Sequence, residues 1–291
     1  MKILIFGATG MFGHKLYQRL GSKFDVAATI RGDFGSIERF ELFEKASIIE
    51  RIDVADPASI RRAIEIARPD CVINAVGIIK QSPKSKDVIE TLTVNSIFPN
   101  RLAQLSTEFG FRLIAISTDC VFDGMKGNYL ESDRPDARDL YGMSKYLGEV
   151  SDDRTLTLRT SIIGRELLTC QSIVEWFLSN RGETVKGYKH ALYTGFPSVV
   201  LAEIIGDLIS DHTGLSGIYH LSSDQISKFD LLSLLNHFYQ ANVTIEPDDG
   251  LVIDRSLDSS KFRAITGFQP AAWTDMVEQM AADTTPYEKL R

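Results

Sequence analysis

The sequence contains few of the residues that form disulfides and metal sites, with three cysteines and five histidines in 291 residues. Cys71, Cys120 and Cys170 are far apart and form no CxxC pair, which favours buried thiols in a reducing compartment over a disulfide framework. The histidines are scattered, without an HExxH pattern or a ligand-like cluster. We therefore expect no metal site.

Long apolar runs and an excess of positive charge are also absent. No apolar run approaches the roughly 18 residues that a membrane helix needs. Lys2 is followed by only four apolar residues before a glycine turn, which is too short for a signal peptide. The chain has 32 Lys and Arg against 39 Asp and Glu, a net charge of −7. We therefore expect a cytoplasmic protein that binds neither membrane nor nucleic acid.

The N-terminus contains a glycine-rich turn between a predicted strand and a predicted helix. The apolar run 3–6 precedes the turn, and residues 14–20 follow it at helical period. Glycines let the chain reverse tightly and let its backbone approach a pyrophosphate, whose charge the helix N-terminus attracts. The residues that we expect to hold this group are Gly7, Thr9, Gly10, Met11, Phe12 and Gly13.

Strands and helices alternate along the first 160 residues. Apolar segments predict strands at 3–6, 25–30, 47–54, 71–77, 111–116 and 155–160, with helices between them. This alternation predicts an α/β fold, a Rossmann-type doubly wound parallel sheet. Ligands of such sheets bind at the carboxyl ends of the strands.

The pattern becomes less regular after residue 160. We predict an NAD(P)-binding domain over 1–160 and a smaller C-terminal α/β substrate lobe over 161–291. A helix near 199–210 is expected to pack back on the first domain. Short strands near 184–185 and 217–221 are assigned to the lobe, which ends in a polar tail.

Arg31, at the end of the second predicted strand, bears on the choice of cofactor. An acidic residue at this place suits the ribose 2′-hydroxyl of NAD, whereas a basic one suits the 2′-phosphate of NADP. Arg31 therefore favours NADP(H), and nearby Asp33 keeps NAD(H) as the alternative.

Tyr141 and Lys145 are four residues apart, on one face of a predicted helix. A lysine ammonium and the charge of an oxidised nicotinamide would stabilise a phenolate and lower the pKa of Tyr141. Such a tyrosine can give a proton to a carbonyl oxygen as hydride reaches its carbon. Thr118, at the end of the fifth predicted strand, can hydrogen-bond the same oxygen.

Five segments together resemble the extended short-chain dehydrogenases/reductases, and within them the dTDP-4-dehydrorhamnose reductase group. They are Gly7–Gly13, Asn74–Gly77, Ser117–Gly124, Tyr141–Lys145 and Leu158–Ser161. The resemblance extends over essentially the whole chain and is most specific over residues 1–164. It implies Thr118, Tyr141 and Lys145 as the catalytic set, with Lys145 also on the nicotinamide ribose and Asp53 near the adenine. The other cofactor-binding residues expected on this basis are Val54, Asn74, Ala75, Val76, Gly77 and Asn95.

The resemblance also implies a nucleotide-linked 4-keto-6-deoxysugar as substrate. Cys120 stands where the group usually has a tyrosine, and Ile162 where an aromatic residue commonly follows, so the identity of the sugar is open. Arg255 and Lys261 are candidates for a diphosphate clamp. The remaining substrate-binding candidates are Lys80, Asp119 and Ser161.

Three functions compete. The first is an NADP-dependent reductase of a nucleotide sugar in polysaccharide biosynthesis. The second is an epimerase or dehydratase, although Asp119–Cys120 lacks the adjacent Glu of the usual dehydratase Asp–Glu pair. The third is a non-catalytic NADP-binding regulatory subunit. A homodimer is compatible with the sequence, which does not determine the oligomeric state.

Overall fold

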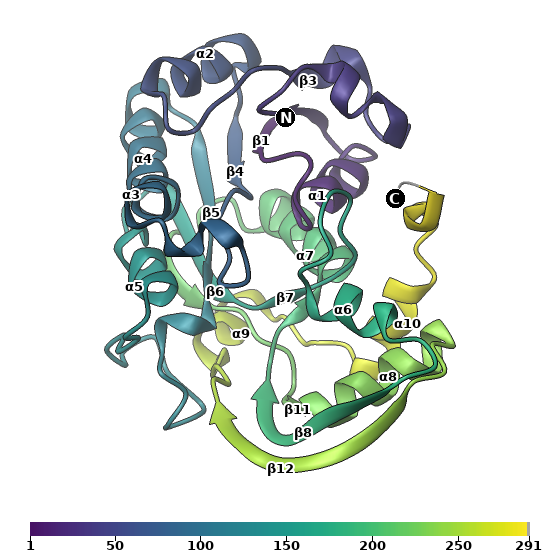
Figure 1. Ribbon diagram of the computed structural model, residues 1–291. Helices are drawn as coiled ribbons and strands as arrows, with labels where there is room; N and C mark the ends of the chain where they lie inside the picture. The colour runs from purple at the N-terminus through teal and green to yellow at the C-terminus, as the bar shows by residue number, and fades with distance from the viewer. Residues whose placement is uncertain (290–291) are drawn as a thin grey trace.

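The computed structural model describes residues 1–289, and its centre is a seven-stranded parallel sheet (Figure 1). In spatial order its strands are β10 (Gly217–His220), β6 (Thr155–Thr160), β5 (Arg112–Thr118), β4 (Cys71–Asn74), β1 (Lys2–Phe6), β2 (Asp25–Thr29) and β3 (Ile48–Ile49). All neighbours in this sheet are parallel. The predicted doubly wound sheet is therefore confirmed.

Helices cover both faces of the large sheet. Along β1, Ile3 and Ile5 face one apolar core, while Leu4 and Phe6 face the other, as expected for a strand buried on both sides. The first core is completed by α1 (Gly13–Leu20) and α7 (Ser198–Asp211), which pack on each other. The opposite core is completed by α2 (Pro57–Ala67) and α4 (Phe98–Phe109). On the same side lie α3 (Val88–Leu92) and α5 (Leu140–Leu147).

A smaller sheet lies below the large one in Figure 1. It contains β11 (Ile226–Ser227), β8 (Thr184–Tyr193) and β12 (Thr244–Asp254), with β8 at its centre. A separate two-stranded pair is formed by β7 (Ile162–Ile163) and β9 (Phe196–Pro197). The helices of this part are α6 (Ile173–Ser179), α8 (Lys228–Tyr239), α9 (Ser260–Thr266) and α10 (Trp273–Ala281).

The structure differs from the sequence-based expectation in three places. The third strand is only two residues long, because the chain after it turns away and Arg51 adopts a positive φ of 56°. The segment near 217–221 forms β10, which pairs with β6 in the large sheet rather than joining the second lobe. The expected polar tail contains α9 and α10, whose buried side chains include Phe262 and Met276. The division of the chain at residue 160 stays a prediction.

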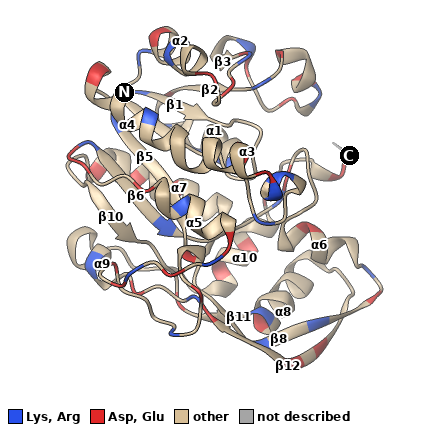
Figure 2. Cartoon of the chain, turned by 60° about the vertical axis from the view of Figure 1, so that its left-hand side comes forward, with Lys and Arg blue, Asp and Glu red and all other residues tan. Residues whose placement is uncertain are grey.

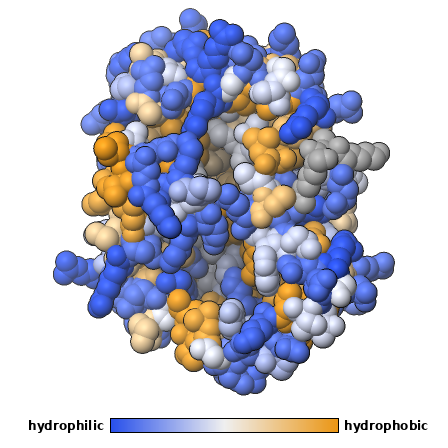
Figure 3. Space-filling model, viewed as in Figure 1, coloured by the Kyte–Doolittle hydropathy of each residue, from blue (hydrophilic) through white to orange (hydrophobic). Residues whose placement is uncertain are grey.

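Figure 2 shows Lys and Arg residues interspersed with Asp and Glu along the chain, and no stripe of one sign stands out in that view. Figure 3 shows that the face seen in Figure 1 is hollowed along its middle. Within residues 1–289, no helix is long and apolar enough to cross a membrane.

Candidate active site

The glycine turn connects β1 to α1 and leaves the start of that helix open. Gly7 has a φ of 94°, and a Cβ on Gly13 would lie 1.9 Å from the Gly7 carbonyl oxygen. No side chain caps α1, and its first turn carries no acidic residue. An uncapped helix start behind a tight glycine turn matches the requirements of a dinucleotide pyrophosphate. The Phe12 side chain is buried in the core, so only its backbone can contribute.

The end of β2 presents Arg31 in an exposed position, as expected. The Arg31 side chain takes part in no hydrogen bond or ion pair within the described part of the chain. Asp33, the residue that would suit NAD, is instead paired with Arg51, with Nε and Oδ1 2.5 Å apart. Exposed Asp53 accepts a hydrogen bond from the Ala55 amide, and Val54 is buried beside it. This arrangement leaves a free cation, not a free carboxylate, at the strand end.

The segment after β4 packs against the glycine turn. A Cβ on Gly7 would lie 2.9 Å from a Val76 methyl and 3.4 Å from the Ala75 carbonyl, so the two loops touch. Asn74 is buried and accepts from the Val76 amide, while Gly77 is exposed.

Asn95, in contrast, has its side chain occupied by structural contacts. Its side-chain amide bonds both the amide and the carbonyl of Ile78 and also donates to the Ser144 hydroxyl. Asn95 therefore holds the loop after β4 to α5, and its expected cofactor contact stays a prediction.

Thr118, Tyr141 and Lys145 gather at the carboxyl end of β5. Thr118 is the last residue of β5, and the Tyr141 hydroxyl lies within hydrogen-bonding reach of it. Asp139 caps α5 through the Gly142 amide at 2.9 Å, which fixes the start of the helix that carries Tyr141. The Lys145 ammonium donates to the Ile116 carbonyl at 2.7 Å. The three expected catalytic residues thus lie on adjoining elements at one sheet edge. We refer to Thr118, Tyr141 and Lys145 as the Thr118 cluster.

Burial dominates the ionisation of these groups. It raises the pKa of Tyr141 well above its ordinary value, and the nearby Cys120 thiol adds to this rise. Desolvation of the phenolate is thus the largest influence on Tyr141 in the chain without cofactor, and the lowering of its pKa by Lys145 together with an oxidised nicotinamide stays a prediction. Burial also lowers the pKa of Lys145 to about 8, although Glu149 acts in the opposite direction.

Glu149 is a neighbour of Lys145 that the sequence analysis did not identify. Its buried carboxylate pairs with Arg159 at 2.7 Å and accepts from the Ser117 hydroxyl at 2.6 Å. Arg159 also contacts His220 Nε2 at 3.2 Å. The position of Glu149, four residues after Lys145, was a visible signal that helical spacing could have used.

The residues expected to bind substrate are only partly brought together. Asp119 is buried, and its carboxylate accepts from Thr118 at 3.1 Å. Burial raises the pKa of Asp119, and it raises the pKa of the partly buried Cys120 to about 12. Ser161 follows β6 and is half-buried.

The cations of this set lie at different distances from the cluster. Arg255 acts electrostatically on Asp119 but donates to the carbonyls of Phe122 and Asp123. Lys80 pairs with Asp139 at the start of α5. Lys261 lies over the Tyr219 ring on β10 and, within the described residues, forms no hydrogen bond or ion pair with Thr118, Tyr141 or Lys145.

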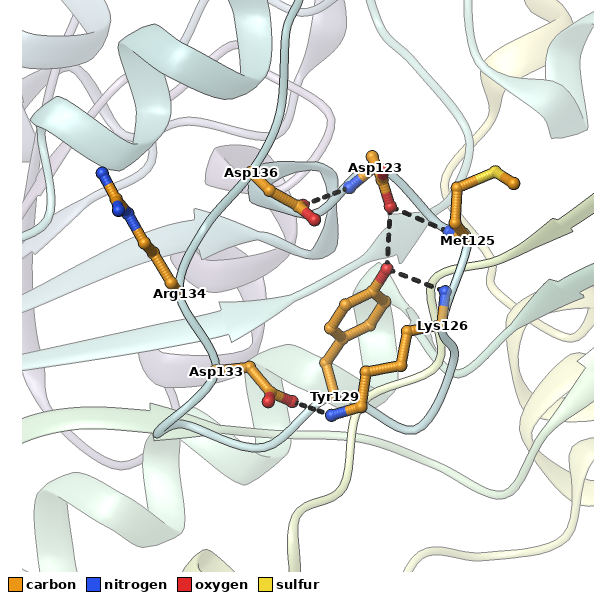
Figure 4. A pocket seen from close by; sticks show the side chains of 7 residues that line it. All are labelled: Asp123, Met125, Lys126, Tyr129, Asp133, Arg134 and Asp136. Carbon is orange, nitrogen blue, oxygen red and sulfur yellow. Dashed lines mark hydrogen bonds and ion pairs between the residues drawn. The ribbon is translucent and has the colours of Figure 1, made fainter.

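Two cavities lie beside this edge rather than on the Thr118 cluster. The first, of 310 Å³, is in the loop after β5. Figure 4 shows the Tyr129 hydroxyl bonded to Asp123 and Lys126 paired with Asp133 in this cavity, while Arg134 is joined to none of the other residues drawn. The second, of 490 Å³, lies where that loop meets the second lobe and is lined by Thr194, Ser222 and Asp254, among others. Neither contains Thr118, Tyr141 or Lys145.

The three cysteines form no disulfide in the structure. Cys71, Cys120 and Cys170 are all free thiols, but Cys170 is exposed, so the expectation of buried thiols was wrong for it. It lies in the loop before α6, where residues 168–170 are all exposed. Within residues 1–289, no group of three or more His, Cys, Asp or Glu side chains is placed to hold a metal ion.

The seven-stranded parallel sheet with helices on both faces is a Rossmann-like α/β fold. The chain belongs to the family described as the RmlD substrate binding domain, whose family model matches residues 1–285. The resemblance inferred from the sequence is therefore confirmed. Among proteins with curated descriptions, no relative matches the chain.

Solved structures of similar fold include reductases of this group. The dTDP-4-dehydrorhamnose reductase of Bacillus anthracis, in complex with NADP, has a TM-score of 0.78 and 22% identity, over 96% of this chain and 98% of that one. A hypothetical dTDP-4-dehydrorhamnose reductase of Sulfolobus tokodaii has a TM-score of 0.76 and 26% identity, over 94% and 98%. WbmG of Bordetella bronchiseptica, in complex with NAD, has a TM-score of 0.77 and 18% identity, over 97% and 93%.

The solved neighbours also include a UDP-glucose 4-epimerase of Thermotoga maritima. At the level of the family, the expectation of an NAD(P)-dependent sugar-nucleotide oxidoreductase is confirmed. The neighbours contain both NADP and NAD.

Proposed function

We propose that this protein is an NADP-dependent reductase of a nucleotide-linked 4-keto-6-deoxysugar. The observation that carries the proposal is the convergence of Thr118, Tyr141 and Lys145 at the end of β5, on the sheet edge that also carries the glycine turn. Membership of the RmlD family supports the class of substrate.

The chain's own residues would bind and protonate the carbonyl group. Bound NADPH would supply the hydride. Because burial raises the pKa of Tyr141, its phenol is protonated at neutral pH, as a general acid for ketone reduction must be. An alkoxide is a stronger base than a phenolate, so transfer of this proton to the nascent alkoxide is favourable.

Thr118 would orient the substrate oxygen. Its hydroxyl proton is directed at Asp119 in this structure, and its oxygen accepts from the Cys120 amide. To bind the substrate, the hydroxyl would have to turn away from Asp119 and lose its hydrogen bond to that carboxyl group.

The test is consumption of NADPH with a panel of dTDP-, UDP- and GDP-linked 4-keto-6-deoxysugars. A reductase consumes one NADPH for each sugar reduced, whereas an epimerase or dehydratase regenerates its cofactor, and a regulatory subunit binds NADPH without consuming it. Because Cys120 and Ile162 replace the aromatic residues usual in the group, we expect the dTDP-linked rhamnose precursor not to be the best substrate.

The variant Tyr141→Phe tests the acid directly. We expect kcat to fall about 100-fold or more, the scale of losing a positioned general acid, while the Kd of NADPH changes little. Unchanged turnover in this variant would refute the mechanism.

A further inference from the structure

Lys228 is a cation without a polar partner beside the Thr118 cluster. It is the first residue of α8, is half-buried, and its Nζ lies 4.3 Å from the centroid of the Tyr193 ring. Within residues 1–289 it forms no ion pair or hydrogen bond. A lysine at the start of a helix is unfavourable, because the helix dipole is positive there. Burial further lowers the pKa of its ammonium. Both the helix dipole and the loss of hydration therefore disfavour a charged ammonium at this position.

Tyr193, the residue beneath Lys228, has an unsatisfied hydroxyl. It ends β8, is 5% exposed, and its hydroxyl has no hydrogen-bond partner of normal geometry in the described chain, although Ser161 lies beside it. A Cβ on Gly195 would lie 2.2 Å from this oxygen, so only glycine lets the ring turn back over the chain. A buried unpaired hydroxyl is expensive and requires an explanation.

Both side chains lie near the residues that follow Thr118. Asp119 and Cys120 act electrostatically on Lys228, and they act on Tyr193 as well. The same two residues act on Tyr141. Tyr193 also lies beside Ser161, which follows Thr160, and Thr160 pairs with Thr118 in the large sheet. Lys228 at the start of α8 and Tyr193 at the end of β8 therefore lie close to the candidate active site.

We propose that Lys228 and the Tyr193 hydroxyl bind hydroxyl groups of the hexose ring of the substrate and so determine which sugars are accepted. The proposal rests on the proposed function for the ligand being a nucleotide sugar. The cluster combines a donor, a hydroxyl that donates and accepts, and the Asp119 carboxyl as acceptor. Sugar hydroxyls both donate and accept, so they suit this mixture. A diphosphate only accepts, and Asp119 would repel it.

The experiment separates the hexose from the nucleotide by comparing ligands with and without the sugar. Calorimetry gives the Kd of dTDP-glucose against dTDP, and of UDP-glucose against UDP, with NADPH bound. For Lys228→Met and Tyr193→Phe we expect the Kd of the hexose nucleotides to rise about tenfold or more, with unchanged Kd values for dTDP, UDP and NADPH. Lys228→Arg, which keeps the charge, should recover part of the affinity.

Lys186→Met is the matched control. Lys186 lies on the same strand as Tyr193, but it is exposed and paired with Asp248 at 2.9 Å, so its loss should change none of these constants. Thermal unfolding of each variant checks that the fold is intact. Equal weakening of dTDP and dTDP-glucose would place Lys228 on the diphosphate and overturn the proposal. Hexose affinities that stay unchanged in both variants would overturn it as well.

The outcome is independent of whether the protein reduces a ketone. If Lys228→Met weakens hexose binding but the wild type consumes no NADPH with any keto-sugar, the sugar subsite stands and the reductase proposal fails. If the wild type is an active reductase and Lys228→Met leaves its KM and the hexose affinities unchanged, the reductase stands and the subsite fails.

Discussion

The Lys145 ammonium bonds a backbone carbonyl, that of Ile116, and among residues 1–289 no carboxylate forms an ion pair with it. Burial therefore has a large effect on it and lowers its pKa from 10.5 to about 8. Glu149 raises this pKa, but the Glu149 carboxylate is itself neutralised by Arg159. Lys145 is thus poised to lose its charge just above neutral pH, unlike an exposed lysine.

This lowered pKa predicts the alkaline limit of activity. Because the protonated form of Lys145 is the competent one, kcat/KM should be level with respect to this group below about pH 8 and should fall about tenfold per pH unit above it. A pH profile of kcat/KM measures this limit. Lys145→Arg, if active, should lose the limit, because arginine stays charged. A wild-type profile that stays level up to 10.5 would contradict the assignment.

Among single residues, Arg31 should decide whether the protein prefers NADPH or NADH. Because Asp33 is paired with Arg51 while Arg31 has no partner in the described chain, we expect NADPH to bind more tightly than NADH. Arg31→Asp should narrow or reverse this preference, since the 2′-phosphate loses a charge-assisted partner and meets a carboxylate. Fluorescence titration of both cofactors measures it. Arg39→Asp, a nearby exposed change, is the control. Equal affinity of the wild type for both cofactors would show that Arg31 is only a loop residue.

At the scale of elements, a buried ion pair joins the end of α5 to β6, near Lys145. Glu149 follows α5 and Arg159 lies in β6, and their side chains are 2% and 4% exposed. The Arg159 guanidinium also lies over the Phe122 ring, and His220 at the end of β10 completes the contact. The pair connects α5, and therefore Lys145, to the part of the sheet that β10 extends.

A double-mutant cycle should show that replacing one member of this pair lowers the free energy of unfolding more than replacing both. Glu149→Met alone should destabilise the fold by about 3 to 5 kcal/mol, because it leaves the Arg159 charge buried and unpaired. Arg159→Met alone should do the same to Glu149. The double variant should be more stable than either single variant. Urea unfolding measures all four proteins, and a double variant less stable than both singles would contradict this account.

At the scale of the whole molecule, the C-terminal segment closes onto the first helix. Lys15, 2% exposed, pairs with Asp283 and donates to the Thr285 hydroxyl at 2.8 Å. His14 Nε2 lies 2.8 Å from the Tyr287 hydroxyl, 273 positions away, and its Nδ1 donates to the Gly10 carbonyl. The end of the chain is therefore coupled through α1 to the glycine turn.

His14 makes the stability of this contact sensitive to acid. Burial lowers its pKa from 6.5 to about 3. As the pH falls through about 6.5, His14 therefore becomes protonated in the unfolded chain but stays neutral in the folded chain. The contribution of neutral His14 to the free energy of unfolding is complete above about pH 6.5. Below that pH it falls by up to about 1.4 kcal/mol per pH unit. Urea unfolding between about pH 7.5 and 5 should show a smaller loss for His14→Gln than for the wild type. Identical slopes in both proteins would contradict this origin.

The sequence by itself determined the elements whose information is local. The strand, glycine turn and helix of residues 3–20 could be predicted because apolar periodicity and three glycines lie within one short segment. The position of Tyr141 and Lys145 on one helix follows from their spacing alone. The parallel order of the large sheet follows from strands and helices in alternation, because right-handed crossovers allow few arrangements.

Only the tertiary structure decided the contacts between distant segments and the charges that depend on burial. The pairing of β10 with β6, the approach of Lys228 and Tyr193 to Asp119, and the docking of Tyr287 on His14 have no local pattern. The direction in which the pKa of Tyr141 shifts depends on how much water the fold removes. Residue spacing specifies which groups a helix carries, but desolvation and long-range packing are properties of the folded chain as a whole.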